Sequence, residues 1–292
     1  MKQLKSPRFQ MVLSMTIFGT LGLFVHNIPL ASGELALYRA ILAAVLIAVY
    51  LGASGQKIPF PRIKKELPLL ILSGMAMGIN WILLFEAYRY TTVSAATLSY
   101  YFAPVIVTAA CPFLFHEKLT PKQIICFVMS TVGLVLITGI GDTSKSGTDL
   151  IGILFGLGAA VFYAGVILLN KFIRNVDGIH RTFLQFLAAI AILIPYAAFT
   201  GGFNLGTLDT VGWVNLLSVG LIHTGLTYCL YFSSLKELPG QKAAILSYID
   251  PLVAVLVSVL LLNEQMTLWQ LAGGILILGF TMWNEISGNK RT

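Results

Sequence analysis

The stretch that decides the fold is Ala243–Glu264, which reads AAILSYIDPLVAVLVSVLLLNE. It is apolar over a length that suits a bilayer crossing, yet its middle holds the ionisable Asp250 followed by the helix-breaking Pro251. The same design occurs earlier, at Ala95–Glu117, which reads AATLSYYFAPVIVTAACPFLFHE. Both copies open with AA-x-LSY, and both place a glutamate thirteen residues after the proline. A proline-interrupted apolar segment at corresponding places in two halves of a chain indicates a transport site.

The composition is that of a membrane protein. Of the 292 residues, 57% are hydrophobic and 11% are charged, whereas soluble domains carry roughly 25% charged residues. Cys111, Cys126 and Cys229 all lie in apolar segments, which favours free thiols packed among helices over a disulfide framework. The apolar run 9–28 is long enough to cross a bilayer, and no small-x-small cleavage site follows it. We therefore interpret this run as an uncleaved first transmembrane helix.

Ten apolar ranges are each near the roughly 20 residues that cross a bilayer, and they must be helices because an open strand leaves its backbone unpaired in lipid. They are 9–28, 34–53, 67–88, 92–115, 121–140, 150–172, 181–200, 211–235, 241–262 and 267–286. With the N-terminus inside, sixteen of the 19 Lys and Arg fall at the inner face. The outer face receives Arg89 and Lys145, and Arg39 lies within a range. This bias predicts cytoplasmic termini, and it explains the net charge of +7 without a nucleic-acid partner.

The repeat divides the chain into two units. We predict a first five-helix repeat at 1–140, a linker at 141–149 and a second five-helix repeat at 150–292. Five is an odd number, so the second repeat is inverted in the membrane relative to the first. The predicted fold class is all-α integral membrane, with ten transmembrane helices as two inverted five-helix repeats. Repeats of this kind place a substrate site near the midplane, between the halves.

This plan resembles the EamA-type carriers of the drug/metabolite transporter superfamily. The resemblance rests on the ten ranges, the paired AA-x-LSY…P…E segments, Phe18–Gly22 (FGTLG) and Arg39 with its apolar run, and it covers essentially the whole chain. It implies a ten-helix carrier of a bacterial plasma (inner) membrane, with both termini cytoplasmic, a central cavity and alternating access. Members move amino acids, nucleotide sugars and cations, so the resemblance leaves the substrate open. The plan works as a monomer and leaves a homodimer open.

Depth in the bilayer selects the candidate site residues. With a rise of about 1.5 Å per residue from the middle of each range, polar and aromatic side chains gather near the midplane. They are Asn80, Trp81, Tyr100, Tyr101, Tyr163, His223, Tyr228, Tyr248 and Asp250. Tyr and Trp that anchor a protein in a membrane lie at its interfaces, so these residues are at the wrong depth for anchoring. We predict that the group lines a cavity, with helix–helix packing as the alternative for any single tyrosine.

Asp250 is the strongest candidate, because a carboxylate at the bilayer centre costs at least about 2.5–3.5 kcal/mol on insertion scales. It could carry a proton, bind a substrate ammonium or partner a buried arginine. The structural alternative is an ion pair with Arg39 that holds two helices together. In the first copy the residue before Pro104 is Ala103, so the acid exists in one half only. This asymmetry favours chemistry over architecture.

Several other residues carry two interpretations each. Arg39 either caps the outer surface or binds a substrate carboxylate. His223 is a second proton-coupling candidate or a satisfied buried histidine. Glu86 and Arg89, three residues apart near the end of a predicted helix, predict a local ion pair.

The sequence contains no nucleotide-binding, phosphate-loop or metalloprotease motif, and we expect neither an enzyme nor a cofactor or metal. It predicts a secondary-active transporter that moves a small polar or amphipathic metabolite, foremost an amino acid or an organic cation, by alternating access. Proton coupling would run through Asp250. The expected partners are this small-molecule substrate and the lipid bilayer. The alternative is a non-transporting scaffold or complex subunit, which predicts a closed interior with Asp250 in a structural ion pair.

Overall fold

The computed structural model describes residues 6–55, 60–115, 119–138, 147–176, 178–238, 243 and 246–288. In these ranges all regular structure is helical. The helices are α1 (Pro7–Gly19), α2 (Leu21–His26), α3 (Ser32–Ala53), α4 (Phe60–Tyr90), α5 (Val93–Tyr100), α6 (Ala103–Phe115), α7 (Pro121–Thr138), α8 (Gly147–Phe172), α9 (Gly178–Thr200), the 3₁₀-helix η2 (Leu205–Thr207), α10 (Thr210–Leu217), the π-helix η3 (Ser218–Leu226), α11 (Thr227–Glu237), α13 (Ile249–Leu260) and α14 (Leu268–Gly288).

The lengths and the exterior of these helices suit a bilayer. Within the described residues, seven helical segments are long and apolar enough to cross a membrane, and Pro121–Ile137 and Ile249–Leu260 are shorter apolar helices. Large apolar side chains stand on the outside of the bundle, among them Phe113, Phe199 and Leu268, which are 82%, 90% and 84% exposed. Contiguous exposed apolar surface marks contact with a membrane or another protein.

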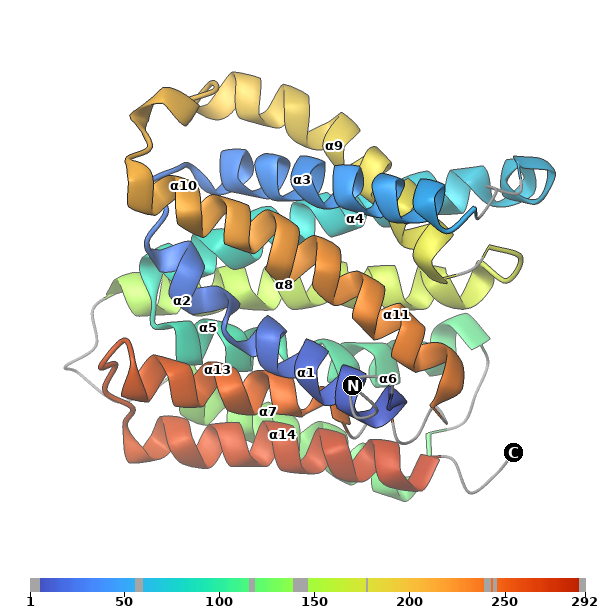
Figure 1. Cartoon of the computed structure of the whole chain (residues 1–292). Coiled ribbons are helices and arrows are strands. Elements are labelled where there is room, and N and C mark those ends of the chain that lie inside the picture. Colours follow the sequence, from blue (N-terminus) through green and yellow to red (C-terminus); the bar gives the residue numbers. More distant parts are fainter. Residues whose placement is uncertain are drawn as a thin grey trace.

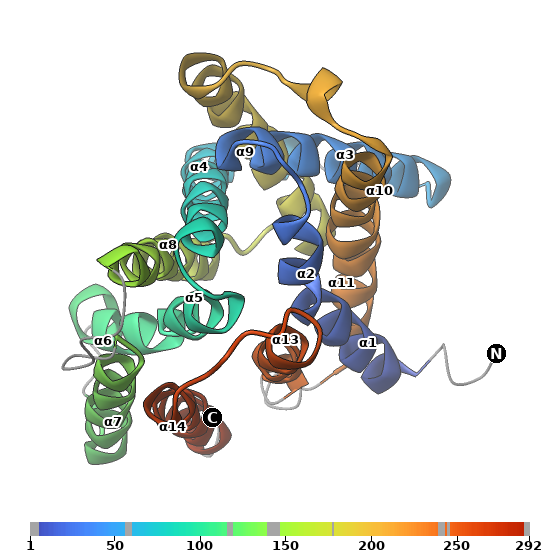
Figure 2. The same cartoon turned by 90° about the vertical axis from the view of Figure 1, so that its left-hand side faces the viewer.

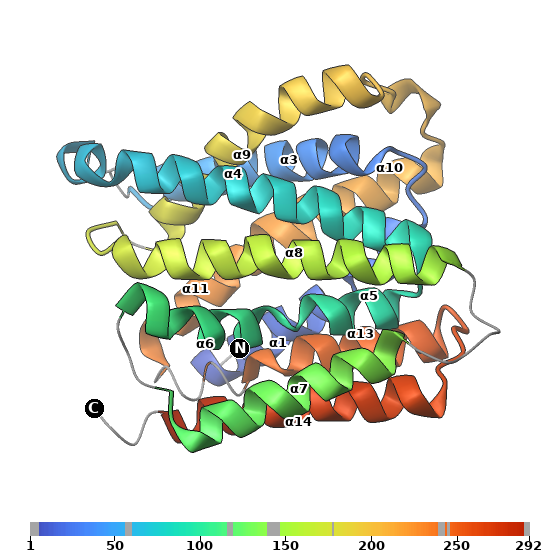
Figure 3. The same ribbon diagram turned by 180° about the vertical axis from the view of Figure 1, so that it is seen from behind.

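The helices run roughly along a common direction (Figure 1). Viewed down that direction, α1 with α2, α3, α4, α5, α8, α11 and α13 surround the middle of the molecule (Figure 2). Helices α7 and α14 pack on each other at one edge, and α9 covers α3 and α4 at the other (Figure 3). Helix α1 from the N-terminal half packs on α11 and α13 from the C-terminal half, so the two halves interlock around the middle.

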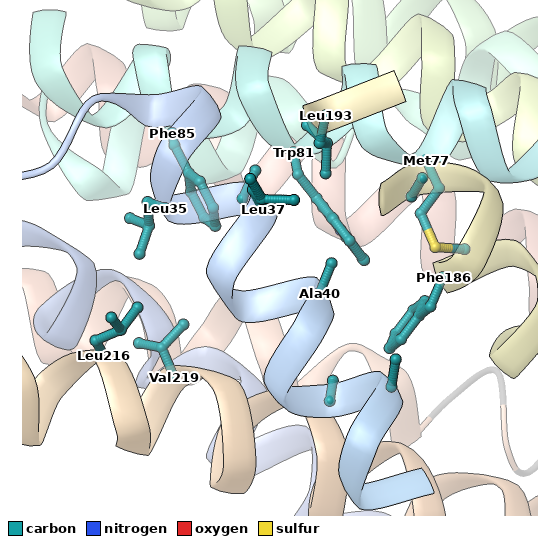
Figure 4. Packing of buried hydrophobic residues seen from close by; sticks show 14 of the residues in the cluster. Leu35, Leu37, Ala40, Met77, Trp81, Phe85, Phe186, Leu193, Leu216 and Val219 are labelled. Carbon is teal, nitrogen blue, oxygen red and sulfur yellow. The ribbon is translucent and has the colours of Figure 1, made fainter. Parts of the chain in front are cut away.

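The largest apolar core lies where α3 meets α4, α9 and η3. Leu37 and Ala40 of α3 face Trp81 of α4, and Leu193 of α9 closes the same layer (Figure 4). All four side chains are at most 4% exposed. Burying a large apolar side chain stabilises a fold by about 1.5–3 kcal/mol against exposure to water, and in a bilayer close packing takes over much of that role. This core fixes α3 in place, and α3 carries Arg39.

Four of the apolar ranges contain breaks or irregular turns at their middle. Pro104 and Pro251 stand at the starts of α6 and α13, where a missing N–H and a ring clash end the preceding helix. The first range breaks at Thr20, between α1 and α2. The eighth continues from α10 into α11 through the π-helix η3. Since breaks and π-turns free backbone groups and re-aim side chains, they concentrate the polar features of the bundle at its centre.

Two packing expectations from the sequence are confirmed. Glu86 and Arg89 form an ion pair of 3.2 Å, and the three cysteines are free.

Candidate functional site

A cavity of about 350 Å³ opens among the broken helices, with walls from both halves of the chain. Its lining residues are Met15, Phe18, Gly19, Leu21, Gly22, Arg39, Met77, Asn80, Trp81, Leu84, Tyr88, Thr97, Tyr100, Tyr101, Pro104, Tyr163, Ile167, Tyr228, Tyr231, Ser247, Tyr248, Asp250 and Ala254. The lining therefore includes Arg39 and every residue selected by depth except His223. One acid and one base stand in a wall that is otherwise mostly apolar and aromatic, with Asn80, Thr97 and Ser247 as further polar residues.

Asp250 lies in the first turn of α13, where the positive end of the helix dipole stabilises a carboxylate. Its Oδ2 accepts a hydrogen bond from the hydroxyl of Tyr101 at 2.5 Å. The two residues meet because each stands beside a proline break, Tyr101 between α5 and α6 and Asp250 one residue before Pro251. No basic side chain of the described residues forms an ion pair with Asp250.

Gly19 at the end of α1 lets the N-terminal half approach the backbone of α13 at Asp250. A Cβ at Gly19 would lie 2.5 Å from the carbonyl oxygen of Asp250 and 2.6 Å from Cβ of Val253. Because the nearer atom is backbone, it could not move aside. The glycine therefore sets the distance between α1 and α13 at the cavity wall.

Arg39 enters the cavity from α3. Its side chain is 3% exposed, and its Nε donates to Thr224 Oγ1 at 2.6 Å. The guanidinium lies over the ring of Trp81, 4.8 Å from the centroid, and 5.5 Å from that of Phe85. Both distances allow cation–π attraction. Arg39 thus faces the interior, and the described structure contains neither the outer-surface cap nor the ion pair with Asp250.

Aromatic rings form most of the remaining wall. Tyr100 packs on Tyr101 and Tyr163, with centroids 5.8 and 5.1 Å apart. Tyr228 packs edge-on against Phe18 at 5.3 Å and against Phe186 at 5.4 Å. Such pairs prefer offset or edge-to-face geometry and hold each ring in one orientation. The wall is therefore pre-formed.

Asn80 and Tyr248 complete the group that the depth argument selected. Asn80 is 2% exposed and donates to the carbonyl oxygen of Ala159 at 2.7 Å, which ties α4 to α8 beside the cavity. Tyr248 is 8% exposed and stands at the turn just before α13. Asn80 is thus partly structural in this state, because one of its amide donors is already used.

His223 lies outside the cavity lining. Its ring is held between Thr20 Oγ1 and the carbonyl oxygen of Ser218, each at 3.0 Å, and packs on Phe24 with centroids 4.5 Å apart. In an α-helix, side chains four residues apart lie on the same face. The π-helix η3 has i→i+5 bonds instead, so the ring points at the break in the first range.

The cavity also contains residues that the sequence did not single out as site residues, chiefly Phe18 and Tyr88. Tyr88 contacts Thr97, with 3.4 Å between the two hydroxyl oxygens. A signal for Tyr88 was available, because it follows Trp81 by seven residues and so shares its face of α4. No cluster of three or more metal-binding side chains occurs in the part of the chain that the structure describes.

Beyond the cavity, α5 and the α13–α14 turn are joined by a second polar cluster. Glu264 accepts from the backbone N–H of Val93 at 2.9 Å and of Ser94 at 3.4 Å, and it also accepts the Ser258 hydroxyl. Ser94 Oγ donates to Ser258 Oγ at 2.6 Å. The repeated glutamate of the second copy therefore caps a helix of the first half. Its counterpart Glu117 lies outside the described residues.

Long apolar helices around a pre-formed polar cavity define the class: a multi-pass membrane carrier. The model of the EamA-like transporter family matches residues 7–139 and 150–284, and the chain belongs to this family. It is accordingly a membrane transporter of the drug/metabolite transporter superfamily, and not an enzyme, that works in a lipid bilayer on a small-molecule substrate.

Relatives agree with this assignment. The uncharacterized transporter YxxF of Bacillus subtilis is 34% identical over 277 residues, which cover 94% of this chain and 88% of that protein. An uncharacterized transporter of Archaeoglobus fulgidus is 28% identical over 281 residues, covering 94% and 95% of the two chains. A solved crystal structure has a TM-score of 0.66 at 14% identity, covering 96% of this chain and 97% of its own, and is similar in fold.

Proposed function

We propose that the protein is a secondary-active transporter that moves a small polar or amphipathic metabolite, an amino acid or an organic cation, across the plasma membrane by alternating access. Asp250 is the site that takes up a proton or a cation. The observation that carries this proposal is a carboxylate in the cavity wall that has one hydroxyl donor, Tyr101, and no ion-pair partner among the described residues. His223, the second coupling candidate, has no part in it, since its ring lies outside the cavity lining.

The size and lining of the cavity support this substrate class. Ligand sites measure about 300–1,000 Å³, so 350 Å³ suits an amino acid or a small amine better than a nucleotide sugar. Tyrosine and tryptophan faces attract ammonium groups by cation–π interaction. Aromatic walls with an acid fit a cation, and the addition of Arg39 fits a zwitterion.

The membrane arrangement is part of the same proposal. We propose ten transmembrane helices in two inverted five-helix repeats, residues 1–140 and 150–292, with 141–149 as linker and both termini cytoplasmic. The family model supports two units by matching one segment in each half. The start of α1 and the end of α14 also lie toward the same end of the bundle (Figure 1). The carrier acts as a monomer, with a homodimer as the second arrangement, and without nucleic acid.

The alternative of a non-transporting scaffold has less support. It requires a closed interior in which Asp250 is paired with Arg39. Both residues line the cavity, and neither forms an ion pair in the described part of the chain.

Uptake into proteoliposomes under an imposed pH gradient tests the proposal. The substrate is first selected by a thermal-shift screen, because a ligand that binds the folded state raises its stability by mass action. We expect Asp250→Asn to abolish the gradient-driven part of uptake. Asp209→Asn is the matched control: Asp209 caps α10 through Gly212 N at 2.7 Å, lies outside the cavity lining, and asparagine caps equally well. Full gradient-driven uptake by Asp250→Asn would overturn the coupling role.

A further inference from the structure

Arg39 has hydrogen-bonding capacity that the protein leaves unused. A guanidinium carries five N–H donors, and in this structure Nε of Arg39 donates to Thr224 while the buried Nη1 has no partner among the described residues. The side chain is 97% buried and lines the cavity. Burying a charged group whose N–H donors lack partners costs free energy unless another group supplies the missing acceptors. The unmatched end therefore indicates a ligand with acceptor oxygens.

Thr224 binds the Nε atom of the Arg39 guanidinium. It lies in the π-helix η3, is fully buried, and its hydroxyl donates to the carbonyl oxygen of Val219, five residues earlier, at 2.7 Å. A hydroxyl has one donor and two acceptor lone pairs. With its proton committed to Val219, the oxygen can only accept from Arg39. The hydrogen bond therefore runs in one direction only, from Arg39 Nε to Thr224 Oγ1.

The rings of α4 fix the plane of the same guanidinium. Trp81 and Phe85 lie 4.8 and 5.5 Å from Arg39 Cζ. Cation–π contact with these two rings and the hydrogen bond at Nε leave Nη1 without a hydrogen-bond partner among the described residues. A planar guanidinium edge matches a carboxylate, to which it can donate two parallel bonds.

Asp250 is not the carboxylate that accepts hydrogen bonds from the Arg39 guanidinium. Its Oδ2 is held by Tyr101, and no ion pair joins it to Arg39. Tyr88, Tyr100 and Tyr228 line the same cavity as the two charged groups. The cavity therefore contains a base and an acid that are not paired with each other.

We propose that Arg39 is a carboxylate-binding subsite, that Thr224 is the positioning residue that aims it, and that the substrate is consequently a zwitterion of the amino-acid class. The substrate carboxylate binds at the guanidinium of Arg39, and its ammonium faces Asp250 and the tyrosine wall. This inference rests on the proposed function and narrows it, because an organic cation without a carboxylate would leave Arg39 unmatched.

Binding of matched compounds to the purified protein tests the subsite. The probes are the twenty standard L-amino acids, each compared with its methyl ester and its decarboxylated amine, by thermal shift and then by calorimetry. We expect one or more amino acids to bind at least about tenfold more tightly than their esters and amines, because a site built to hydrogen-bond a group rejects analogues that lack it. This comparison uses the wild-type protein and depends on no variant.

Thr224→Val then tests the positioning role, with Thr227→Val as its matched control. Thr227 is also fully buried and also donates five residues back, to Ile222 O at 2.7 Å, but neither bonds to Arg39 nor lines the cavity. We expect Thr224→Val to weaken binding of the amino acid about tenfold and to leave binding of the ester unchanged. Thr227→Val should keep the wild-type ratio of acid to ester affinity.

Three outcomes would contradict the inference. Esters and amines that bind wild type as tightly as the acids would overturn the carboxylate subsite and leave the transporter proposal standing. Absence of binding by acids, esters and amines alike would overturn the subsite together with the proposed substrate class. Equal loss of acid and ester affinity in Thr224→Val, matched by Thr227→Val, would reduce Thr224 to a structural residue.

Discussion

Two hydroxyl groups hold the two charges of the cavity, Tyr101 on Asp250 and Thr224 on Arg39. Neither charge is neutralised by a permanent opposite charge among the described residues. A neutral donor or acceptor orients a charged group but leaves its charge available. At the scale of single residues, the site is therefore arranged to bind and release charged groups.

Tyr101→Phe isolates the hydroxyl on the acid. The substitution keeps the ring and removes the donor, and a hydrogen bond to a charged group contributes about 1.5–3 kcal/mol. We expect uptake driven by a pH gradient to fall about tenfold or more at an unchanged protein yield. The control is Tyr196→Phe, on α9 outside the cavity, where the ring is 38% exposed. Wild-type uptake by Tyr101→Phe would mean that Asp250 works without this hydroxyl.

At the scale of elements, Glu264 joins the α13–α14 turn to the start of α5. It satisfies two backbone N–H groups of a helix N-terminus and one buried hydroxyl. The residue before it, Asn263, has a φ of 55°, a backbone conformation that Asn tolerates better than most residues. The turn is thus shaped to present the carboxylate to α5.

Glu264→Ala removes this cap. Loss of a capping side chain typically costs about 1 kcal/mol, so we expect the Tm in detergent to fall by about 2–4 °C. Glu86→Ala serves as the control, because Glu86 pairs with Arg89, whose side chain is 60% exposed, and exposed pairs contribute little. Equal Tm values for the two variants would argue against a structural role for the cap.

Glycines of α8 provide a second comparison between elements. A Cβ at Gly152 would lie 2.8 Å from the backbone nitrogen of Thr91, whereas one at Gly165 would meet nothing within 4 Å. Gly152→Ala should therefore push α8 away from the α4–α5 connection and lower the Tm. Gly165→Ala should leave the Tm unchanged or raise it, since alanine favours helix by about 0.5–1 kcal/mol. A thermal-melt series on the two variants gives the result directly.

At the scale of the whole molecule, the proposed topology can be read by labelling. Ser54 follows α3 and Gly206 lies in η2 between α9 and α10, and both are exposed. With the three native cysteines replaced, we expect a membrane-impermeant maleimide to label Gly206→Cys on intact cells. Ser54→Cys should react only after permeabilisation. Labelling of both from outside would contradict the ten-span arrangement with cytoplasmic termini.

The helices were predictable because the length of an apolar run and the backbone's need for internal hydrogen bonds leave one solution in lipid. The breaks at Pro104 and Pro251 were predictable as well, since the proline ring removes a backbone N–H and clashes with the preceding helical turn. The break at Thr20 and the π-helix were not. No proline marks either, and they are joined through space by the contact between Thr20 and His223.

The candidate site was likewise predictable only in part. Depth along a helix follows from counting residues, and it placed Asp250 inside the bundle, whereas for Arg39 it left an outer-surface cap open. Rotation about the helix axis depends on local geometry, which the sequence did not reveal in η3, so His223 was expected on the wrong side. Phe18 was overlooked because a phenylalanine in an apolar run gives no polar signal.

The π-helix η3 also determines how the protein would respond to the deletion of a single residue. A turn of π-helix contains about one more residue than a turn of α-helix. Loss of a single codon within Ser218–Leu226 would let this segment relax to an ordinary α-helix and leave the residues after it close to their original faces, whereas the same loss from an α-helical segment would rotate all that follows by about 100°. Tyr228 and Tyr231 would then still face the cavity, and the apolar length of the span would hardly change. A single-codon deletion within η3 should therefore preserve both membrane insertion and the tyrosine wall of the cavity.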